Sequence, residues 1–185
     1  MAGGRERTSV EVRLVTPDDA SGLTSFFRAL PEGDRSFFRE DVTSADVVAK
    51  MTTGTEARSG NHRLVALVDD TVVGYAAVLA RHGWSRHVGE LRIATAPDFR
   101  QRGIGRLLAQ RVVVEARHLG LEKLVVDVVA GQDRLFDMFT RLGFEQEGRL
   151  RAHVRSTTGE TRDLLVLAHF VDKLSEDLAS DRAGS

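Results

Sequence analysis

Two apolar runs in the first half of the chain predict an antiparallel β-hairpin. Residues 64–68 and 72–80 are rich in valine, leucine and alanine, and only Asp69-Asp70-Thr71 separates them. A connection this short joins antiparallel strands, whereas parallel strands need a crossover of about a dozen residues or more. The chain must therefore fold around a sheet that contains at least one antiparallel pair.

The remaining periodicities alternate between strand and helix. Apolar residues with period two, or in a continuous run, predict strands over 11–15, 88–95, 124–129, 148–154 and 164–170. Helical spacing and capping residues predict helices over 17–30, from Thr43 to about Met51 (with Asp46 completing a capping box), 104–119 and 132–142. The last two strands pair across the turn Thr157-Thr158-Gly159. This order indicates the α/β class, with a single mixed, mostly antiparallel sheet flanked by helices.

Length and composition limit the classes of protein to consider. A chain of 185 residues is the usual size of one domain, which we place at 9–174 between flexible tails at 1–8 and 175–185. The net charge of -1 excludes a protein-wide attraction to nucleic acid or membrane, and the absence of cysteine excludes a thiolate nucleophile. The longest uncharged apolar run, 72–80, is too short to span a bilayer. We expect a soluble, cytoplasmic protein.

The segment from Ala94 to Leu108 joins a strand end, a glycine-bearing loop and a helix start. The first N–H groups of a helix lack intrahelical acceptors and its dipole is positive there, so this arrangement favours an anion. Residues 100–118 hold five arginines and one acid, Glu115, a local charge of +4. The simpler interpretation is a capped helix start with solvent-exposed arginines.

Other common sites find no support in the sequence. Leu108 stands where a dinucleotide-binding fingerprint needs a third glycine, and no Gly-Lys-Ser/Thr of a P-loop occurs. The six histidines lack the spacing of metal ligands, so we expect no metal. Gly-x-Ser-x-Gly is absent as well, which leaves serine catalysis without a motif.

The pattern Arg-x-x-Gly-x-Gly at 100–105, three residues after Pro97, resembles the acyl-CoA pyrophosphate loop of the GNAT superfamily of N-acetyltransferases. The order of predicted elements is also similar to that family's, and Leu142-Gly143-Phe144 stands where its second signature segment ends. The resemblance covers about residues 9–170. It implies a GNAT-like acyl-CoA N-acyltransferase fold with acetyl-CoA as cosubstrate.

The resemblance assigns roles to individual residues. In this family the strand before the loop bulges, and its end offers backbone groups to the pantetheine arm of CoA, here at Ile93, Ala94 and Thr95. Backbone N–H groups of the loop would bind the pyrophosphate. The cofactor-binding residues expected in and beside this loop are Arg100, Gln101, Arg102, Gly103, Ile104, Gly105 and Arg106.

Three positions in the second signature segment depart from the family pattern. Many members carry Asn, Ala and Tyr where this chain has Gln132, Leu135 and Phe139. Gln132 and Phe139 are still expected at the cofactor, but Phe139 has no proton to give to the departing thiolate. Because a thiol has a pKa of about 8.5, the thiolate can leave near neutral pH without that acid. Bacterial protein-lysine acetyltransferases, which the chain resembles in part, also lack this tyrosine.

Glu90 is the candidate general base. It begins the strand next to the expected thioester site, and an ammonium acceptor with a pKa of about 10.4 must lose a proton before it attacks. Family members often place a glutamate in this strand. A solvent-facing carboxylate paired with Arg92 is the alternative role for Glu90, and Asp127 on the next strand is the reserve candidate.

These features predict an N-acetyltransferase that transfers an acetyl group directly to a primary amine of a protein lysine or a small amino compound. The alternative is a non-catalytic acyl-CoA-binding sensor or interaction module. A nucleic-acid partner is less well supported, because no aromatic residues are interleaved with the arginines. Residues 31–41, 82–87 and 151–163 are expected to converge around the acceptor, and a homodimer is left open.

Overall fold

The hairpin predicted from the two apolar runs is present in the computed structural model, which describes residues 9–35, 37–38, 40–53, 60–156 and 158–171. Strands β2 (Asn61–Val68) and β3 (Thr71–Ala80) pair antiparallel. Asp69 and Asp70 connect them with φ of 46° and 61°, the left-handed conformation that a two-residue hairpin turn requires. The predicted tails at 1–8 and 175–185, and Thr157, lie outside the described residues.

The strands form one seven-stranded sheet in the order β1-β2-β3-β4-β5-β7-β6. The other strands are β1 (Glu11–Leu14), β4 (Val88–Thr95), β5 (Lys123–Val129), β6 (Glu145–Arg155) and β7 (Thr161–Phe170). Among the described strands, only β4 and β5 pair in parallel; the other neighbours are antiparallel. The predicted mixed, mostly antiparallel sheet is confirmed.

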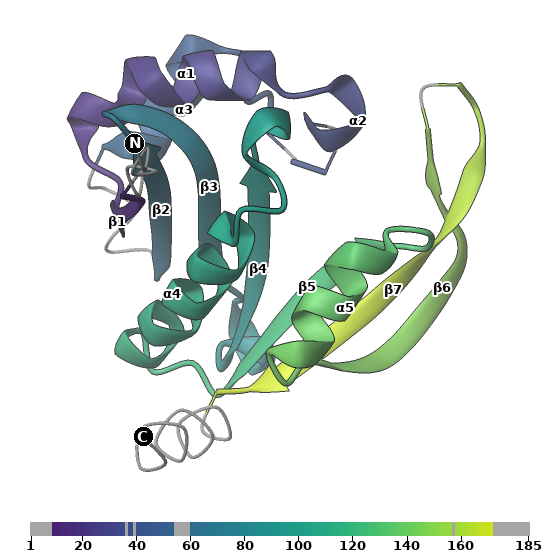
Figure 1. The fold of residues 1–185 in the computed structure, drawn as a ribbon. Coiled ribbons are helices and arrows are strands. Elements are labelled where there is room, and N and C mark those ends of the chain that lie inside the picture. Colours follow the sequence, from purple (N-terminus) through teal and green to yellow (C-terminus); the bar gives the residue numbers. More distant parts are fainter. Residues whose placement is uncertain (1–8, 36, 39, 54–59, 157, 172–185) are drawn as a thin grey trace, which may run out of the picture.

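Helices cover both faces of the sheet (Figure 1). They are α1 (Ala20–Ala29), α2 (Glu32–Arg35), α3 (Ala45–Thr52), α4 (Ile104–His118) and α5 (Asp133–Arg141). Leu23 and Phe27 of α1 share a buried cluster with Val65 and Tyr75 of the sheet, and we call that side the α1/α3 face. Leu108 and Val112 of α4 and Phe139 of α5 belong to the larger core on the opposite side, the α4/α5 face.

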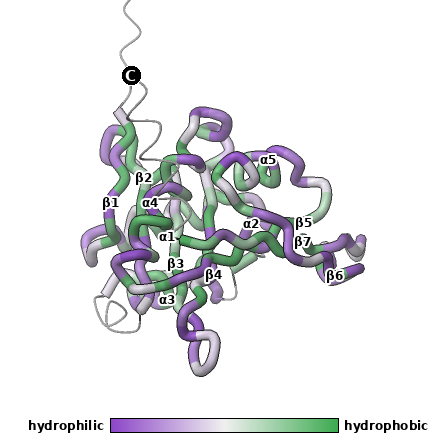
Figure 2. The backbone as a smooth tube through the Cα atoms, turned by 90° about the horizontal axis from the view of Figure 1, so that it is seen from below, coloured by the Kyte–Doolittle hydropathy of each residue, from purple (hydrophilic) through white to green (hydrophobic). Residues whose placement is uncertain are grey.

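Close packing of α4 on the sheet depends on a glycine. A Cβ placed on Gly74 of β3 would lie 2.9 Å from Leu108 Cδ1 and 3.2 Å from Ile104 Cγ2. The hydropathy of the backbone follows this arrangement: hydrophobic residues run along the central strands, and hydrophilic residues occupy the outer part of the β6–β7 hairpin (Figure 2). The start of α4 is therefore held at a fixed place against β3 and β4.

Helix starts were predicted with mixed success. Before α1, the N–H of Thr16 donates to Asp19 Oδ2 at 2.7 Å, as in a capping box. The second box, expected between Thr43 and Asp46, is wrong. The helix begins two residues later at Ala45, because the Thr43 hydroxyl binds Asp41 Oδ1 at 2.6 Å instead. The loop predicted at 31–41 also contains the short helix α2.

Candidate active site

A wedge opens in the sheet between β4 and β5. The two strands pair only at Val88–Lys123, Gly89–Leu124 and Glu90–Val125, and they diverge beyond these pairs (Figure 1). On its other side β4 stays paired with β3 as far as Thr95. Residues 91–95 of β4 therefore present an open backbone edge to the wedge, where N–H and C=O groups can meet a ligand.

The bulge expected in β4 is not found. Within the described sheet, the register between β3 and β4 is continuous from Gly89 to Thr95. The register shifts lie in other pairs, between Ala66 and Leu67 of β2 and at two places in β6. The open edge beside Ile93, Ala94 and Thr95 arises from the divergence of β5 instead.

The first turn of α4 lies beside the end of β4. Gln101 and Gly103 both have positive φ, 63° and 82°, and Gly103 is the N-cap of the helix. The N–H groups of the first turn, at Ile104 to Arg106, have no acceptor within the helix. A Cβ on Gly103 would have no atom within 4 Å, and one on Gly105 would lie 3.8 Å from Thr95 Oγ1. The loop thus presents free donors and an uncrowded backbone, which fits a phosphate group.

The arginines counted in the sequence do not all gather at this loop. Arg100 pairs with Asp34 of α2 and also donates to the carbonyl oxygen of Thr95 at 3.2 Å, while Arg102 lies over the ring of Phe99 at 4.9 Å. Arg111 pairs with Glu115 inside α4, and Arg117 lies in the last turn. The local charge of +4 is therefore spread from the loop to the last turn of α4.

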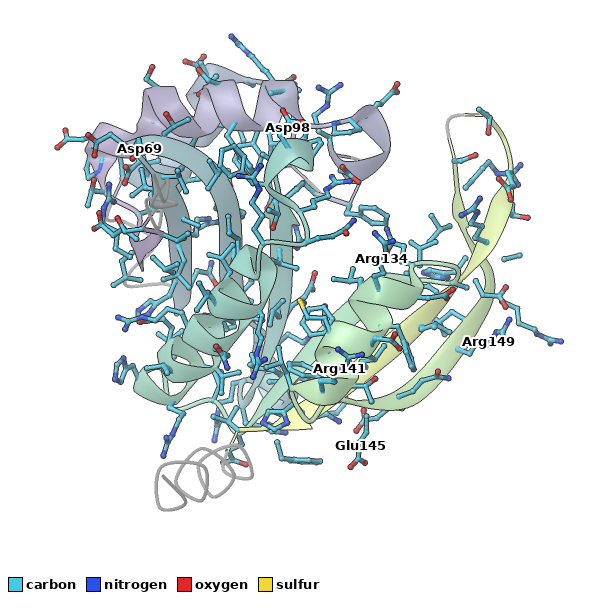
Figure 3. All side chains as sticks on the ribbon, viewed as in Figure 1. Asp69, Asp98, Arg134, Arg141, Glu145 and Arg149 are labelled. Carbon is cyan, nitrogen blue, oxygen red and sulfur yellow. The ribbon has the colours of Figure 1, made fainter. Side chains whose placement is uncertain are left out.

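The sequence analysis did not include two arginines of α5 that line a hollow beside α4. A hollow of about 250 Å³ lies between α4 and α5, lined by Arg106, Arg134, Asp137, Met138, Arg141 and Leu142. Arg134 lies toward the start of α5 and Arg141 at its end (Figure 3). The sequence does contain a signal for this hollow, because helical spacing puts residues 134, 137, 138 and 141 on one face of the predicted helix.

The three positions of the second signature segment that differ from the family pattern have clear structural roles. Gln132 is the N-cap of α5, and its Oε1 accepts a hydrogen bond from the N–H of Val129 at 3.3 Å. Leu135 packs against the main core. Phe139 is 0% exposed, with its ring 5.1 Å from that of Phe144. In this conformation Phe139 is a core residue and does not reach the surface of the groove.

Glu90 lies at the vertex of the wedge, in the last residue pair between β4 and β5. Arg92 Nε donates to Glu90 Oε1 at 3.0 Å, and Arg92 Nη1 donates to Glu40 Oε2 at 3.1 Å. The Glu90 side chain is 16% exposed and that of Arg92 10%. The expected pairing with Arg92 is therefore present, and through Arg92 it connects Glu90 to residues 31–41.

Glu90 and Asp127 share the α1/α3 face. Glu90 pairs with Val125, and residues two apart on a strand point to the same side of a sheet, so Asp127 lies on this side as well. Asp127 is exposed to solvent. The start of α4 lies on the opposite face. The two faces of the sheet meet at the edge of β4 that borders the wedge.

Tyr75 is the buried aromatic residue closest in register to the end of β4. It stands opposite Ala94 and is 2% exposed. Burial raises the pKa of Tyr75 to about 12, against a smaller lowering by Arg63. The ring contacts Phe27 and Phe38 at 5.1 and 5.9 Å between centroids. Tyr75 therefore stays protonated and helps to hold Phe38 over the sheet.

The expected convergence of three segments is only partly right. Residues 31–41 reach β4 through Glu40, and the tip of the β6–β7 hairpin lies toward the same end of the molecule as α2 (Figure 1). Residues 82–87 precede Val88 and join the opposite end of β4, where the carbonyl of His87 accepts from Glu122 N–H at 2.9 Å. Trp84, 97% exposed, is therefore remote from the open end of the wedge.

Within the described ranges, no group of three or more His, Asp or Glu side chains is placed to hold a metal ion. None of the described helices combines the length and the apolar character needed to cross a membrane.

Solved structures share this fold over almost all of the chain. An acetyltransferase of the GNAT family from Streptococcus pneumoniae has a TM-score of 0.77 at 18% identity, covering 88% of this chain and 99% of the other. The acetyltransferase yncA from Salmonella typhimurium, solved with its cofactor acetyl-CoA, has 0.77 at 19% identity, with 88% and 94% covered. A ribosomal-protein-alanine N-acetyltransferase from Brucella melitensis has 0.77 at 26% identity, with 86% and 99% covered.

The sequence itself matches a family model. Residues 27–144 match the model described as the acetyltransferase (GNAT) family, a range that includes Glu90, the loop 100–106 and the whole of α4 and α5. Comparison with curated proteins gave no match. The wedge, the helix start beside it and this match agree with the resemblance found in the sequence, and the chain belongs to the acetyltransferase (GNAT) family of N-acetyltransferases that use acetyl-CoA.

Proposed function

We propose that this protein transfers the acetyl group of acetyl-CoA directly to a primary amine that binds on the α1/α3 face at Glu90. The observation that carries the proposal is the wedge, which opens at Glu90 and has the start of α4 beside it on the other face. Two substrates can then approach one point from opposite sides of the sheet, and holding them there lowers the entropic part of the barrier.

The α4/α5 face is the proposed place for acetyl-CoA. The backbone of Gln101 to Arg106 would hold the pyrophosphate, and the open edge at Ile93, Ala94 and Thr95 would hold the pantetheine arm. Space supports this placement, because Gly103 and Gly105 leave the backbone accessible where a larger side chain would stand. Gln132 is the N-cap of α5, a helix on the same face. Acetyl-CoA supplies the acetyl group as a thioester.

Glu90 is proposed to accept the proton that the ammonium must lose. The amine nitrogen then attacks the carbonyl carbon, a C–N bond forms, the C–S bond breaks, and the thiolate takes its proton from solvent. Backbone N–H groups on the open edge of β4 would stabilise the negative charge on the carbonyl oxygen. No enzyme-bound acyl group is needed, and the sequence has no cysteine to carry one.

Arg92 is proposed as a positioning residue for Glu90. It is held between two carboxylates, at 3.0 Å from Glu90 Oε1 and 3.1 Å from Glu40 Oε2. Such charge-assisted bonds fix the direction of a carboxylate more firmly than a single contact with water does. Glu40 belongs to the segment after α2, so the same contacts connect the proposed base to residues that border the acceptor.

The acceptor is proposed to be a protein lysine or a small amino compound. The segments 31–41 and 151–163, which are expected around the acceptor, carry paired charges of both signs: Asp34 pairs with Arg100, Glu40 with Arg92, and Asp163 with Arg149. A polycation such as an aminoglycoside would favour a uniformly acidic surface instead. The similar Brucella protein is named for alanine of a ribosomal protein, so a protein amino terminus belongs among the candidates to be tested.

The deciding experiment measures thiol release from acetyl-CoA with a panel of amines. The panel contains amino acids, polyamines, aminoglycosides, a peptide with an N-terminal alanine, and lysine-bearing proteins, followed by mass spectrometry of acetylated products. Acetyl-lysine that depends on the enzyme supports the lysine assignment. Turnover of a free small amine without protein acetylation contradicts it, and binding of acetyl-CoA without turnover of any amine contradicts the proposed catalysis.

A further inference from the structure

The hollow between α4 and α5 carries more positive charge than the proposed pyrophosphate site needs. It is lined by three arginines, Arg106, Arg134 and Arg141, and by one acid, Asp137. Met138 and Leu142 supply the rest of its lining. The hollow of about 250 Å³ is thus a concave site with three cationic donors that come from two helices.

These three arginines differ from most others near the loop. Arg100 is paired with Asp34, and Arg111 with Glu115. Among the residues that the structure describes, Arg106, Arg134 and Arg141 form no ion pair with an acidic side chain. Like charges that border one hollow repel each other unless an anion lies between them. The arrangement therefore favours a ligand with concentrated negative charge.

The hollow is continuous with the start of α4. A Cβ on Gly105 would lie 3.4 Å from Met138 Sδ, which lines the hollow. Arg106 belongs both to the first turn of α4 and to the hollow. A ligand whose diphosphate binds at the helix start can therefore place a second phosphate group against α5.

CoA has such a second group, the monophosphate on the 3′ position of its ribose. A phosphate monoester carries a charge of about −1.5 to −2 at pH 7 and three acceptor oxygens, and guanidinium groups bind such oxygens in pairs. We propose that Arg134 and Arg141 of α5, together with Arg106 of α4, bind the 3′-phosphate and select CoA over thiols that lack it. This inference rests on the proposed placement of acetyl-CoA.

The test compares the affinities for CoA and 3′-dephospho-CoA by titration calorimetry. Wild-type protein should bind CoA about 30-fold or more tightly, the effect of one or two charge-assisted hydrogen bonds. In the double variant Arg134→Gln, Arg141→Gln the preference should fall to within about threefold, while the affinity for 3′-dephospho-CoA stays unchanged. Both side chains are exposed, and circular dichroism checks that the variant is folded.

A matched control is Arg117→Gln, which removes an exposed arginine from the last turn of α4 and should keep the wild-type preference. Equal affinity of the wild type for both ligands overturns the 3′-phosphate site but leaves the proposed function intact. A full preference in the double variant overturns the assignment to Arg134 and Arg141. Failure of the wild type to bind either ligand overturns the proposed placement of acetyl-CoA and this inference together.

Discussion

Glu90 of β4 stands opposite Val125 of β5 in the last residue pair that joins the two halves of the sheet. A carboxylate at this point lies where the open edge of β4 begins. It forms an ion pair with Arg92, at 3.0 Å. This relationship makes Glu90 the residue whose replacement tests the proposed chemistry most directly.

The variant Glu90→Gln should keep the shape of the side chain at position 90 and remove its basicity. We expect turnover to fall by roughly 100-fold or more, with the affinity for acetyl-CoA little changed. Steady-state kinetics and calorimetry measure the two effects separately.

The control for this variant is Glu40→Gln, which removes the other carboxylate on Arg92. It should change turnover by less than about tenfold, because Arg92 still reaches Glu90. Near-normal turnover of Glu90→Gln, with its pH profile intact, would make Glu90 a structural partner of Arg92 and would turn attention to Asp127.

The variant Gly105→Ala should separate binding from stability. The added Cβ would lie 3.4 Å from Met138 Sδ, a tolerable contact, and alanine is up to about 1 kcal/mol better than glycine within a helix. The melting temperature should therefore be maintained, while the affinity for acetyl-CoA falls by about tenfold or more because the backbone is less accessible. An unchanged affinity in the folded variant would exclude this groove as the binding site.

Gly103 is a less suitable position for the same test. Its φ of 82° lies in the left-handed region, so a Cβ there adds about 1–2 kcal/mol of backbone strain although no atom stands in its way. Gly103→Ala should lower both stability and affinity, and the comparison of the two variants distinguishes steric blocking from loss of the loop conformation.

The variant Phe139→Tyr should not restore a general acid. Phe139 is completely buried against Phe144, so the new hydroxyl group would be placed in the core. We expect a loss of about 1–3 kcal/mol in unfolding free energy and no gain in turnover. Urea unfolding and kinetics check both. A rise in turnover would show that this ring can reach the thiolate after all.

The stability of the protein should depend on pH through Asp19. Arg13 donates to this buried carboxylate at 2.7 and 2.8 Å, and this bond, with the capping contacts from Thr16, lowers the pKa of Asp19 in the folded state. A lowered pKa stabilises the fold above the unfolded value of about 3.9, and the contribution is lost as the pH falls through the folded value.

Asp19→Asn tests this dependence. At pH 7 the variant should lose about 1.5–3 kcal/mol of unfolding free energy, the range for a hydrogen bond to a charged group. The difference from wild type should shrink as the pH is lowered from 5 to 2. A difference that is constant across this range would show that the carboxylate charge contributes nothing.

The elements that the sequence predicts well are those whose signals are local. The hairpin at Asp69-Asp70, the amphipathic α4 and the glycine loop before it each depend on neighbouring residues, and each is found close to its predicted place. The capping box at Thr43 failed because an equally local competitor, Asp41, takes its hydroxyl group.

The parts that could not be predicted depend on residues far apart in the chain. In the sequence, Glu115 is one acid among arginines that could all be exposed to solvent. In the structure it is 1% exposed, and its carboxylate lies 2.8 Å from Nδ1 of His62 in β2. The hollow needs α4 and α5 side by side before Arg134 can be associated with Arg106. Neither the contact of Glu115 with His62 nor the proximity of Arg134 to Arg106 can be inferred from the positions of these residues along the chain.

The short ladder at the vertex of the wedge also has a mechanical consequence. Val88–Glu90 and Lys123–Val125 are the residues that join β4 to β5. This short ladder is therefore a hinge between two parts of the sheet, β1 to β4 on one side and β5 to β7 on the other. A ligand that fills the wedge contacts both parts and stabilises the distance between them. Amide hydrogens of residues 91–95 and 126–129 should then exchange more slowly with solvent deuterium when acetyl-CoA is bound, whereas those of β1, outside the hinge, should exchange at their original rate.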